Sequence, residues 1–200
     1  MPAFLHVGCG PKRTDRTPFA GMGWDEIRLD IDPAVHPDVV GTMLDMAAVN
    51  TASVDAVFSS HNIEHLYPHE VPLALAEFQR VLAPGGFALI TCPDLQSVAA
   101  LVAANKLLEP AYTSPAGPIT PLDILYGHRP PMAAGNLFMA HRCGFTRDVL
   151  VATLQAAGFA QVAASQRPQV FDLWALATRQ PWPDDELRAA AGRYIPGWGG

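Results

Sequence analysis

Residues 5–11 of the chain are Leu-His-Val-Gly-Cys-Gly-Pro, and residues 29–33 are Leu-Asp-Ile-Asp-Pro. The first is an apolar run that breaks into a glycine-rich turn, and the second is an apolar run that ends on an acid. In an open α/β sheet, ligands bind beyond the carboxyl ends of the strands, and glycines there let the backbone approach a ligand because they lack a Cβ. A carboxylate at the tip of the neighbouring strand can accept hydrogen bonds from both hydroxyls of a ribose. The two stretches therefore predict an α/β fold with a site for a nucleoside-type cofactor.

The composition is that of one globular domain. The chain has 200 residues, of which half are apolar and 16% are charged, so it can bury one substantial core. Its net charge of −6 and the absence of a long lysine and arginine block disfavour a nucleic-acid partner. Four cations near the amino end are expected to lie on a solvated loop, with contact to an anion or substrate as the alternative. These cations are Lys12, Arg13, Arg16 and Arg28.

The cysteines and the apolar runs indicate which cellular compartment to expect for the protein. Cys9, Cys92 and Cys143 are odd in number and widely spaced, which fits neither a zinc pattern nor a disulfide framework. The sequence shows no secretory signal and no apolar run long enough for a membrane span. We therefore expect a reduced, cytoplasmic protein without a membrane partner. Arginine outnumbers lysine eleven to two, which is typical of GC-rich bacterial genomes.

Short apolar runs and periodic segments predict alternating strands and helices. In residues 69–83, Val71, Leu75 and Phe78 share one helical face, and Pro72 falls in the first turn, where proline is tolerated. Strands are expected at residues 4–7, 26–31, 38–43, 54–59, 87–91, 159–164 and 171–178. Helices are expected at residues 69–83, 94–108, 146–157 and 184–193.

Residues 11–25 depart from this alternation. Pro18, Gly21 and Gly23 oppose a helix there, so we expect a loop and a shortened amino-terminal helical region. The whole order predicts a single α/β domain over residues 1–200, built on a doubly wound, seven-stranded, mostly parallel sheet.

Residues 109–140 contain six prolines and three glycines, which predicts a proline-rich loop inserted in the domain. Loops of this length in a compact domain are often lids or binding loops. We expect this lid to shape a substrate pocket through Tyr126, His128 and Arg129. Residues 179–200 form a carboxyl-terminal tail whose role the sequence does not indicate.

Five motifs, taken in order, resemble class I S-adenosylmethionine-dependent methyltransferases of the small bacterial type, close to the methyltransferase-11 group. The resemblance covers roughly residues 4–178. The motifs are His-Val-Gly-Cys-Gly-Pro at 6–11, Leu-Asp-Ile-Asp-Pro at 29–33, the run from Val54 to Leu66, the run from Glu77 to Asp94, and His-Arg-Cys-Gly-Phe-Thr at 141–146 with Leu-Gln-Ala-Ala-Gly-Phe at 154–159.

The resemblance implies a Rossmann-like fold, S-adenosylmethionine as cofactor, S-adenosylhomocysteine as product, and methyl transfer to a small-molecule acceptor. It assigns the turn under the methionine part to Gly8, Cys9 and Gly10, the ribose contact to Asp30, and the adenine contact to Ile31. It places Asp45 and Met46 at the adenine amino edge, and Ser59, Ser60 and His61 beside the methionine moiety and the acceptor. Lys12 stands where the family usually has a third glycine.

Histidines are the candidate bases for an oxygen or nitrogen acceptor, because an imidazole can take a proton near neutral pH. His61 is preferred because it follows the tip of the strand at 54–59, and His128 and His141 are the other two candidates. Each of the three can instead be an ordinary hydrogen-bonded or exposed histidine.

Three other functions compete with this one. Residues 61–65 are His-Asn-Ile-Glu-His, which matches an inverted zinc-protease motif. That motif requires both histidines on a helix, whereas here it follows a strand, so we expect no metal. A nicotinamide enzyme would require a third glycine that opens a helix. An inactive S-adenosylmethionine-binding or interaction protein of the same fold is the remaining alternative. Separately, Cys9 is expected to be a packing residue.

Overall fold

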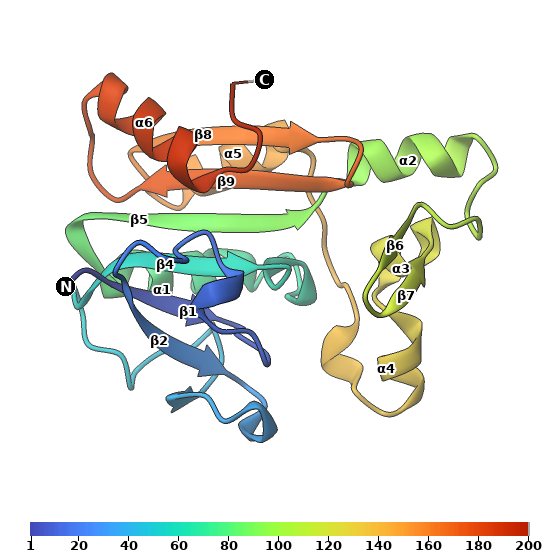
Figure 1. Ribbon diagram of the computed structural model, residues 1–200, viewed down its shortest axis with the longest axis horizontal. Helices are drawn as coiled ribbons and strands as arrows, with labels where there is room; N and C mark the ends of the chain where they lie inside the picture. The colour runs from blue at the N-terminus through green and yellow to red at the C-terminus, as the bar shows by residue number, and fades with distance from the viewer. Residues whose placement is uncertain (200) are drawn as a thin grey trace.

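The computed structural model describes residues 1–199 and is organised around one twisted seven-stranded sheet (Figure 1). The strand order is β3-β2-β1-β4-β5-β9-β8. The first five strands are parallel, and β9 is antiparallel to both β5 and β8. This confirms the predicted doubly wound, mostly parallel sheet. The strands are β1 (Ala3–Val7), β2 (Asp25–Asp30), β3 (Val39–Val40), β4 (Val54–Ser60), β5 (Leu82–Pro93), β8 (Gln161–Arg167) and β9 (Asp172–Thr178).

The helices are short, and they cover the sheet unequally. The connection from β1 to β2 contains only the 3-10 helix η1, so the described part of the chain has no α-helix between its first two strands. No helix within residues 1–199 combines the length and apolarity required to span a membrane. The main helices are α1 (Val71–Val81), α2 (Leu95–Ala103), α5 (Arg147–Ala156) and α6 (Asp184–Tyr194), and the 3-10 helices near the sheet are η1 (Thr14–Arg16), η2 (Pro33–Val35) and η3 (Ile63–His65).

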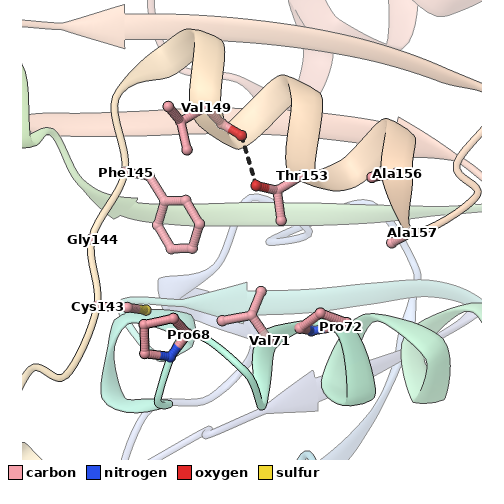
Figure 2. Close-up of a pocket in the computed structure, with 10 residues that line it drawn as sticks. All are labelled: Pro68, Val71, Pro72, Cys143, Gly144, Phe145, Val149, Thr153, Ala156 and Ala157. Carbon is pink, nitrogen blue, oxygen red and sulfur yellow. Dashed lines mark hydrogen bonds between the residues drawn. The ribbon is translucent and has the colours of Figure 1, made fainter.

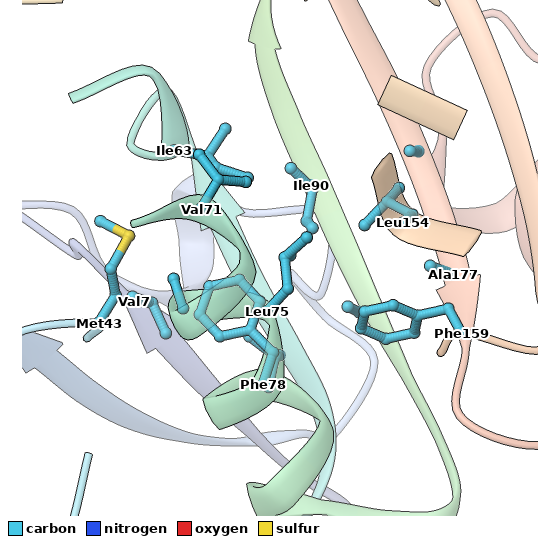
Figure 3. Packing of buried hydrophobic residues seen from close by; sticks show 14 of the residues in the cluster. Val7, Met43, Ile63, Val71, Leu75, Phe78, Ile90, Leu154, Phe159 and Ala177 are labelled. Carbon is cyan, nitrogen blue, oxygen red and sulfur yellow. The ribbon is translucent and has the colours of Figure 1, made fainter. Parts of the chain in front are cut away.

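Alternating side chains of the strands form two cores, one on each face of the sheet. On one face, α1 and α5 bury aliphatic residues against the sheet, including Leu75 and Leu154 (Figure 3). On the other face, the core is rich in aromatic residues. Phe19, from the loop after β1, stacks on Phe4 with ring centroids 4.2 Å apart and lies 5.1 Å from the ring of Tyr194 in α6. The carboxyl-terminal helix α6 thus packs with the loop after β1 on this face of the sheet.

Several predicted boundaries shift for local reasons. The helix after Asp94 ends at Ala103 rather than near residue 108, because Asn105 adopts a positive φ of 61°. Strand β3 has only two residues, and Gly41 follows it. Strand β5 begins at Leu82, directly after α1, and is therefore longer than the predicted strand at 87–91.

Residues 109–140 are a folded insertion rather than an irregular loop. They lie beyond the carboxyl ends of the parallel strands (Figure 1). Thr120 and Asp123 form a capping box at the start of α3, and the Arg129 guanidinium holds the pKa of Asp123 well below its usual range. Ile119 and Ile124 pack on Val98 of α2, which attaches the insertion to the domain. Its elements are β6 (Tyr112–Ser114), β7 (Gly117–Ile119), α3 (Pro121–Tyr126), α4 (Arg129–Ala133) and η4 (Leu137–Met139).

Candidate functional site

A cleft of about 420 Å³ opens at the carboxyl ends of β1, β2 and β4. Its volume lies within the usual range for small-molecule pockets. One end is formed by the turns after β1, β2 and β3, and the other end by the segment after β4 together with residues of the insertion. The cleft is lined by Val7, Gly8, Gly10, Pro11, Leu29, Asp30, Ile31, Asp32, Val35, Gly41, Thr42, Met43, Leu44, His61, Asn62, His65, Leu66, Glu70, Asn136, Phe138, Met139 and Arg142.

The glycine turn after β1 requires glycine for two different reasons. Gly8 has a φ of +63°, its N–H donates to the Leu29 carbonyl at 2.9 Å, and a Cβ on it would lie 2.1 Å from the Asn62 side-chain nitrogen. Gly10 has a φ of +53°, but a Cβ there would meet no described atom within 4 Å. At position 10, glycine is therefore required for the backbone conformation alone. At position 8, it also allows the Asn62 side chain to approach the backbone closely.

Asp30 and Arg28, at the end of β2, hold this turn in place. The Asp30 carboxylate accepts hydrogen bonds from the Gly10 N–H at 2.7 Å and from the Asp32 N–H at 2.9 Å. The Arg28 guanidinium, only 2% exposed, donates to the carbonyls of Gly10 at 2.5 Å and His36 at 2.6 Å. Lys12, Arg13 and Arg16 are exposed as predicted, but Arg28 is not on a solvated loop. Its side chain joins the turns after β1 and β2.

The other end of the cleft begins where β4 ends. His61 has a φ of +51°, a strained conformation for a residue with a side chain, and its N–H donates to the Thr91 carbonyl at 2.8 Å. Its ring is half exposed. The next residue, Asn62, directs its amide toward Gly8, and among residues 1–199 its buried Nδ2 has no hydrogen-bond partner. Strain and an unsatisfied donor at one place are typical of binding sites.

A buried carboxylate with histidines around it lies beside this end of the cleft. Glu64 is 1% exposed, and the Nδ1 of His61 lies 3.6 Å from its Oε1. Burial alone would raise the pKa of Glu64, but His61, His65 and His141 together lower it, so the carboxylate is ionised. Burial lowers the pKa of His141, and Glu64 opposes that effect. The site therefore concentrates one negative charge among three imidazoles.

The structure distributes the predicted site residues unevenly. Gly8, Gly10, Asp30, Ile31 and His61 line the cleft. The remaining predicted residues lie outside its lining. Cys9, Met46 and Ser59 are buried, Ser60 is half-buried, and Asp45, Tyr126 and Arg129 are exposed, while His128 precedes α4 and His141 joins the Glu64 cluster.

Cys9 behaves as a packing residue. Its thiol is 1% exposed, and burial raises the pKa of that thiol to about 11, so it stays protonated at neutral pH. Asn62 and Arg142 line the cleft but were not predicted from the sequence. Asn62 could have been inferred from the sequence because it directly follows His61, whereas only the fold brings Arg142 to the cleft.

A second hollow lies between α1 and α5 (Figure 2). It has a volume of about 490 Å³, and its walls are mostly apolar, with Val71 on one side and Phe145 and Val149 on the other. The Thr153 hydroxyl donates to the Val149 carbonyl at 2.7 Å, and burial raises the pKa of the Cys143 thiol to about 11. This hollow shares no lining residue with the cleft, so it contributes no chemistry to the site.

A seven-stranded sheet in this order, with a ligand cleft at its glycine turn, defines the Rossmann-like fold of class I S-adenosylmethionine-dependent methyltransferases. Residues 5–90 match the family described as Methyltransferase domain. This match spans less than half of the chain, and it agrees with the resemblance stated from the motifs. A search of curated proteins finds no match.

Solved structures with this fold are distant in sequence. The chain is similar to the 1,6-didemethyltoxoflavin-N1-methyltransferase of Burkholderia thailandensis, solved with 1,6-didemethyltoxoflavin and S-adenosylhomocysteine bound, at 18% identity and a TM-score of 0.56 over 90% of this chain and 72% of that one. It is similar to a possible histamine N-methyltransferase of Thermotoga maritima at 14% identity and a TM-score of 0.58, over 90% and 83% of the two chains. A methyltransferase of Archaeoglobus fulgidus gives 15% identity and a TM-score of 0.59 over 88% and 86%.

Proposed function

We propose that the protein binds S-adenosylmethionine in the cleft and transfers its methyl group to a small-molecule acceptor. The observation that carries the proposal is the glycine turn locked to Asp30. The Gly10 N–H donates to the Asp30 carboxylate across the carboxyl ends of adjacent strands, where an α/β sheet binds its ligand. The carboxylate keeps acceptor capacity for the ribose hydroxyls, because its two oxygens offer about four lone-pair sites.

The cofactor fits two features of the cleft. The Asn62 amide occupies the space where a Cβ at position 8 would lie, so glycine at this position lets the amide pack against the turn. The orphaned Nδ2 of Asn62 is a donor without a partner in the described chain, and a cofactor oxygen beside Gly8 would satisfy it. We assign the adenosine to the side of Asp30 and Ile31, and the methionine part to the side of Gly8 and Asn62.

When bound, S-adenosylmethionine supplies an electrophilic methyl group on a sulfonium. The chain's own residues would position the acceptor and keep water out, which lowers the barrier through orientation. Phe138 and Met139 supply an apolar wall at the acceptor end. The Nδ1 of His61 faces Glu64, which leaves Nε2 to receive a proton from an acceptor hydroxyl or amine. His61 is better placed for this role than His128, which does not line the cleft.

The acceptor we propose is a small molecule rather than nucleic acid. The net charge of −6 disfavours a partner with a phosphate backbone. The acceptor end of the cleft is built from Asn136, Phe138 and Met139, which offer one amide and two apolar side chains. Such a surface suits a partly apolar metabolite with a hydroxyl, amine or ring nitrogen.

Calorimetry with S-adenosylmethionine and S-adenosylhomocysteine tests the cofactor assignment. Asp30→Ala should weaken both affinities at least tenfold, whereas Asp148→Ala, at an exposed carboxylate on α5, should leave them unchanged. Affinity unchanged by Asp30→Ala would refute the assignment. Release of S-adenosylhomocysteine with a panel of hydroxyl, amine and heterocyclic acceptors tests the activity. Binding without turnover on any class would favour the inactive binding protein instead.

A further inference from the structure

One carboxylate and two imidazoles converge beside the acceptor end of the cleft. Glu64 and His65 come from η3, and His141 comes from the segment that follows the insertion. One potential ligand atom from each of the three lies within 4.8 Å of the others. The backbone fixes this arrangement, because the Glu64 carbonyl accepts hydrogen bonds from the N–H groups of Arg142 at 2.8 Å and Cys143 at 3.2 Å.

The Glu64 carboxylate lacks the partners that a buried charge requires. It is 1% exposed, and within residues 1–199 neither of its oxygens accepts a hydrogen bond. Buried charges in proteins are paired and hydrogen-bonded, or they coordinate a metal. The nearest cationic candidate, the Nδ1 of His61, stands 3.6 Å from Oε1, which is longer than a hydrogen bond.

The two imidazoles are oriented as metal ligands are. The Nδ1 of His65 lies 3.1 Å from the Ala140 carbonyl, and the Nδ1 of His141 lies 2.8 Å from the Ile124 carbonyl. Because a carbonyl can only accept, the proton of each neutral ring sits on Nδ1, and Nε2 keeps its lone pair. Metal-bound histidines show this same pattern, in which the second ring nitrogen donates to a backbone carbonyl or carboxylate.

We propose that Glu64, His65 and His141 bind a divalent transition-metal ion, with Zn²⁺ as the reference ion. Two histidines and one glutamate are a known ligand set of zinc sites that keep a position open for a small molecule. Ligands at about 2.1 Å in tetrahedral geometry are about 3.4 Å apart, so modest side-chain movement closes the present spacing. His65 lines the cleft, so the open position would be offered to an oxygen or nitrogen of a molecule bound there.

This site differs from the inverted zinc-protease motif at residues 61–65. That motif would use His61 and His65 from one helix, whereas here His61 ends β4 and His65 belongs to the 3-10 helix η3. The third ligand, His141, is contributed by a segment that the motif does not include. The metal site stands on its own contacts and does not depend on the proposed methyl transfer.

The test uses the full chain, freed of metal with a chelator and titrated with Zn²⁺ by calorimetry. Wild type should bind one Zn²⁺ per chain, and its melting temperature should rise by about 5–10 °C at a hundredfold excess over Kd. His141→Asn and the isosteric Glu64→Gln should each weaken Zn²⁺ binding at least a hundredfold. His69→Asn is the matched control, because His69 is exposed and stacks only on Tyr67, so the variant should change affinity less than twofold.

A second measurement guards against misfolded variants. Co²⁺ bound to wild type should show the visible absorption of a four- or five-coordinate ion, and His141→Asn should abolish it while S-adenosylmethionine binding, measured in parallel, is retained. The proposal is overturned if His141→Asn and wild type bind Zn²⁺ equally, or if Co²⁺ keeps the spectrum of the free aqueous ion. If the wild-type protein binds Zn²⁺ but not S-adenosylmethionine, the proposed function is refuted and the metal site is retained.

Discussion

The cleft has a proposed cofactor end, at the turns after β1 and β2, and a proposed acceptor end, beyond β4, and the two differ in how their polar groups are satisfied. At the cofactor end, the Gly10 N–H is bound by Asp30, and the Gly10 carbonyl is bound by Arg28. Beyond β4, the Nδ2 of Asn62, which faces Gly8 between the two ends, and both carboxylate oxygens of Glu64 at the acceptor end have no hydrogen-bond partner in residues 1–199. The Nε of Arg28 and the Nε2 of His6 also lack a partner, but both side chains are held through their other nitrogens. Glu64 has no hydrogen bond at either oxygen, which indicates where a bound molecule or ion would complete the structure.

The two ends therefore differ in how far their structure depends on a bound molecule. The cofactor end is rigid because neighbouring turns hold one another, so it is organised before any ligand arrives. The acceptor end is assembled from η3, the insertion and Arg142, and its chemistry depends on what enters it. Substitutions at the first end should therefore affect stability and cofactor affinity together, and those at the second end should affect turnover with little effect on either.

The largest effect is expected from Gly8→Ala. The new Cβ would lie 2.1 Å from Asn62, and alanine at a φ of +63° also costs about 1 kcal/mol. Calorimetry should show S-adenosylmethionine affinity at least a hundredfold lower. Gly10→Ala is the matched control, because it carries only the backbone cost and meets no atom. Equal losses in the two variants would show that close approach at Gly8 is unimportant.

Arg28→Met should have the next largest effect. It leaves the carbonyls of Gly10, Val35 and His36 without the buried guanidinium that binds them. The expected loss is about 2–4 kcal/mol of unfolding free energy, measured by urea denaturation. Arg13→Met, at an exposed position of the same charge, should cost less than about 0.5 kcal/mol. A loss that small for Arg28→Met would mean that the two turns do not depend on this side chain.

Phe138→Ala should produce a smaller effect, confined to the acceptor end. Phe138 and its neighbour Leu137 in η4 are both exposed, but of the two only Phe138 lines the cleft. Loss of the ring should raise the acceptor KM about tenfold, equivalent to about 1.4 kcal/mol of lost contact, and leave cofactor affinity within twofold. Leu137→Ala should change neither quantity. A matching rise for Leu137→Ala would point to a general disturbance of the insertion.

The residues predicted around the glycine turn line the cleft, whereas those predicted for the substrate in the insertion do not, and the reason is physical. Gly8, Gly10 and Asp30 act through backbone turns and strand tips, which short stretches of sequence encode directly. The contact between Asn62 and Gly8 and the gathering of His141 with Glu64 depend on how distant segments pack. Arg28 was expected on a solvated loop because it is one of four cations near the amino end. The structure buries it against backbone carbonyls, which leave no mark in a sequence.

The smallest predicted effect is that of acid on local stability. As the pH falls, the region around the glycine turn should lose stability before the insertion does. Near the cofactor end, the Nδ1 of His6 lies 2.7 Å from Glu26, which also accepts hydrogen bonds from Thr14. Burial lowers the pKa of His6, Lys12 and Arg28 act in the same direction, and Glu26 opposes them. The unfolded chain therefore takes up this proton first, so stability falls as the pH drops below about 6.5.

The insertion should resist acid longer. Arg129 holds the pKa of Asp123 below its ordinary value of 3.8, so that pair stabilises the fold above this pH and ceases to do so as the pH falls below it. Hydrogen exchange, corrected for intrinsic rates, should show residues 11–25 losing protection between pH 6.5 and pH 5, while residues 119–129 keep theirs until below pH 4. His6→Gln should remove the first transition and leave the second. The reverse order would mean that the insertion is the weaker part, and that the cofactor end owes its stability to contacts other than the network of His6, Glu26 and Thr14.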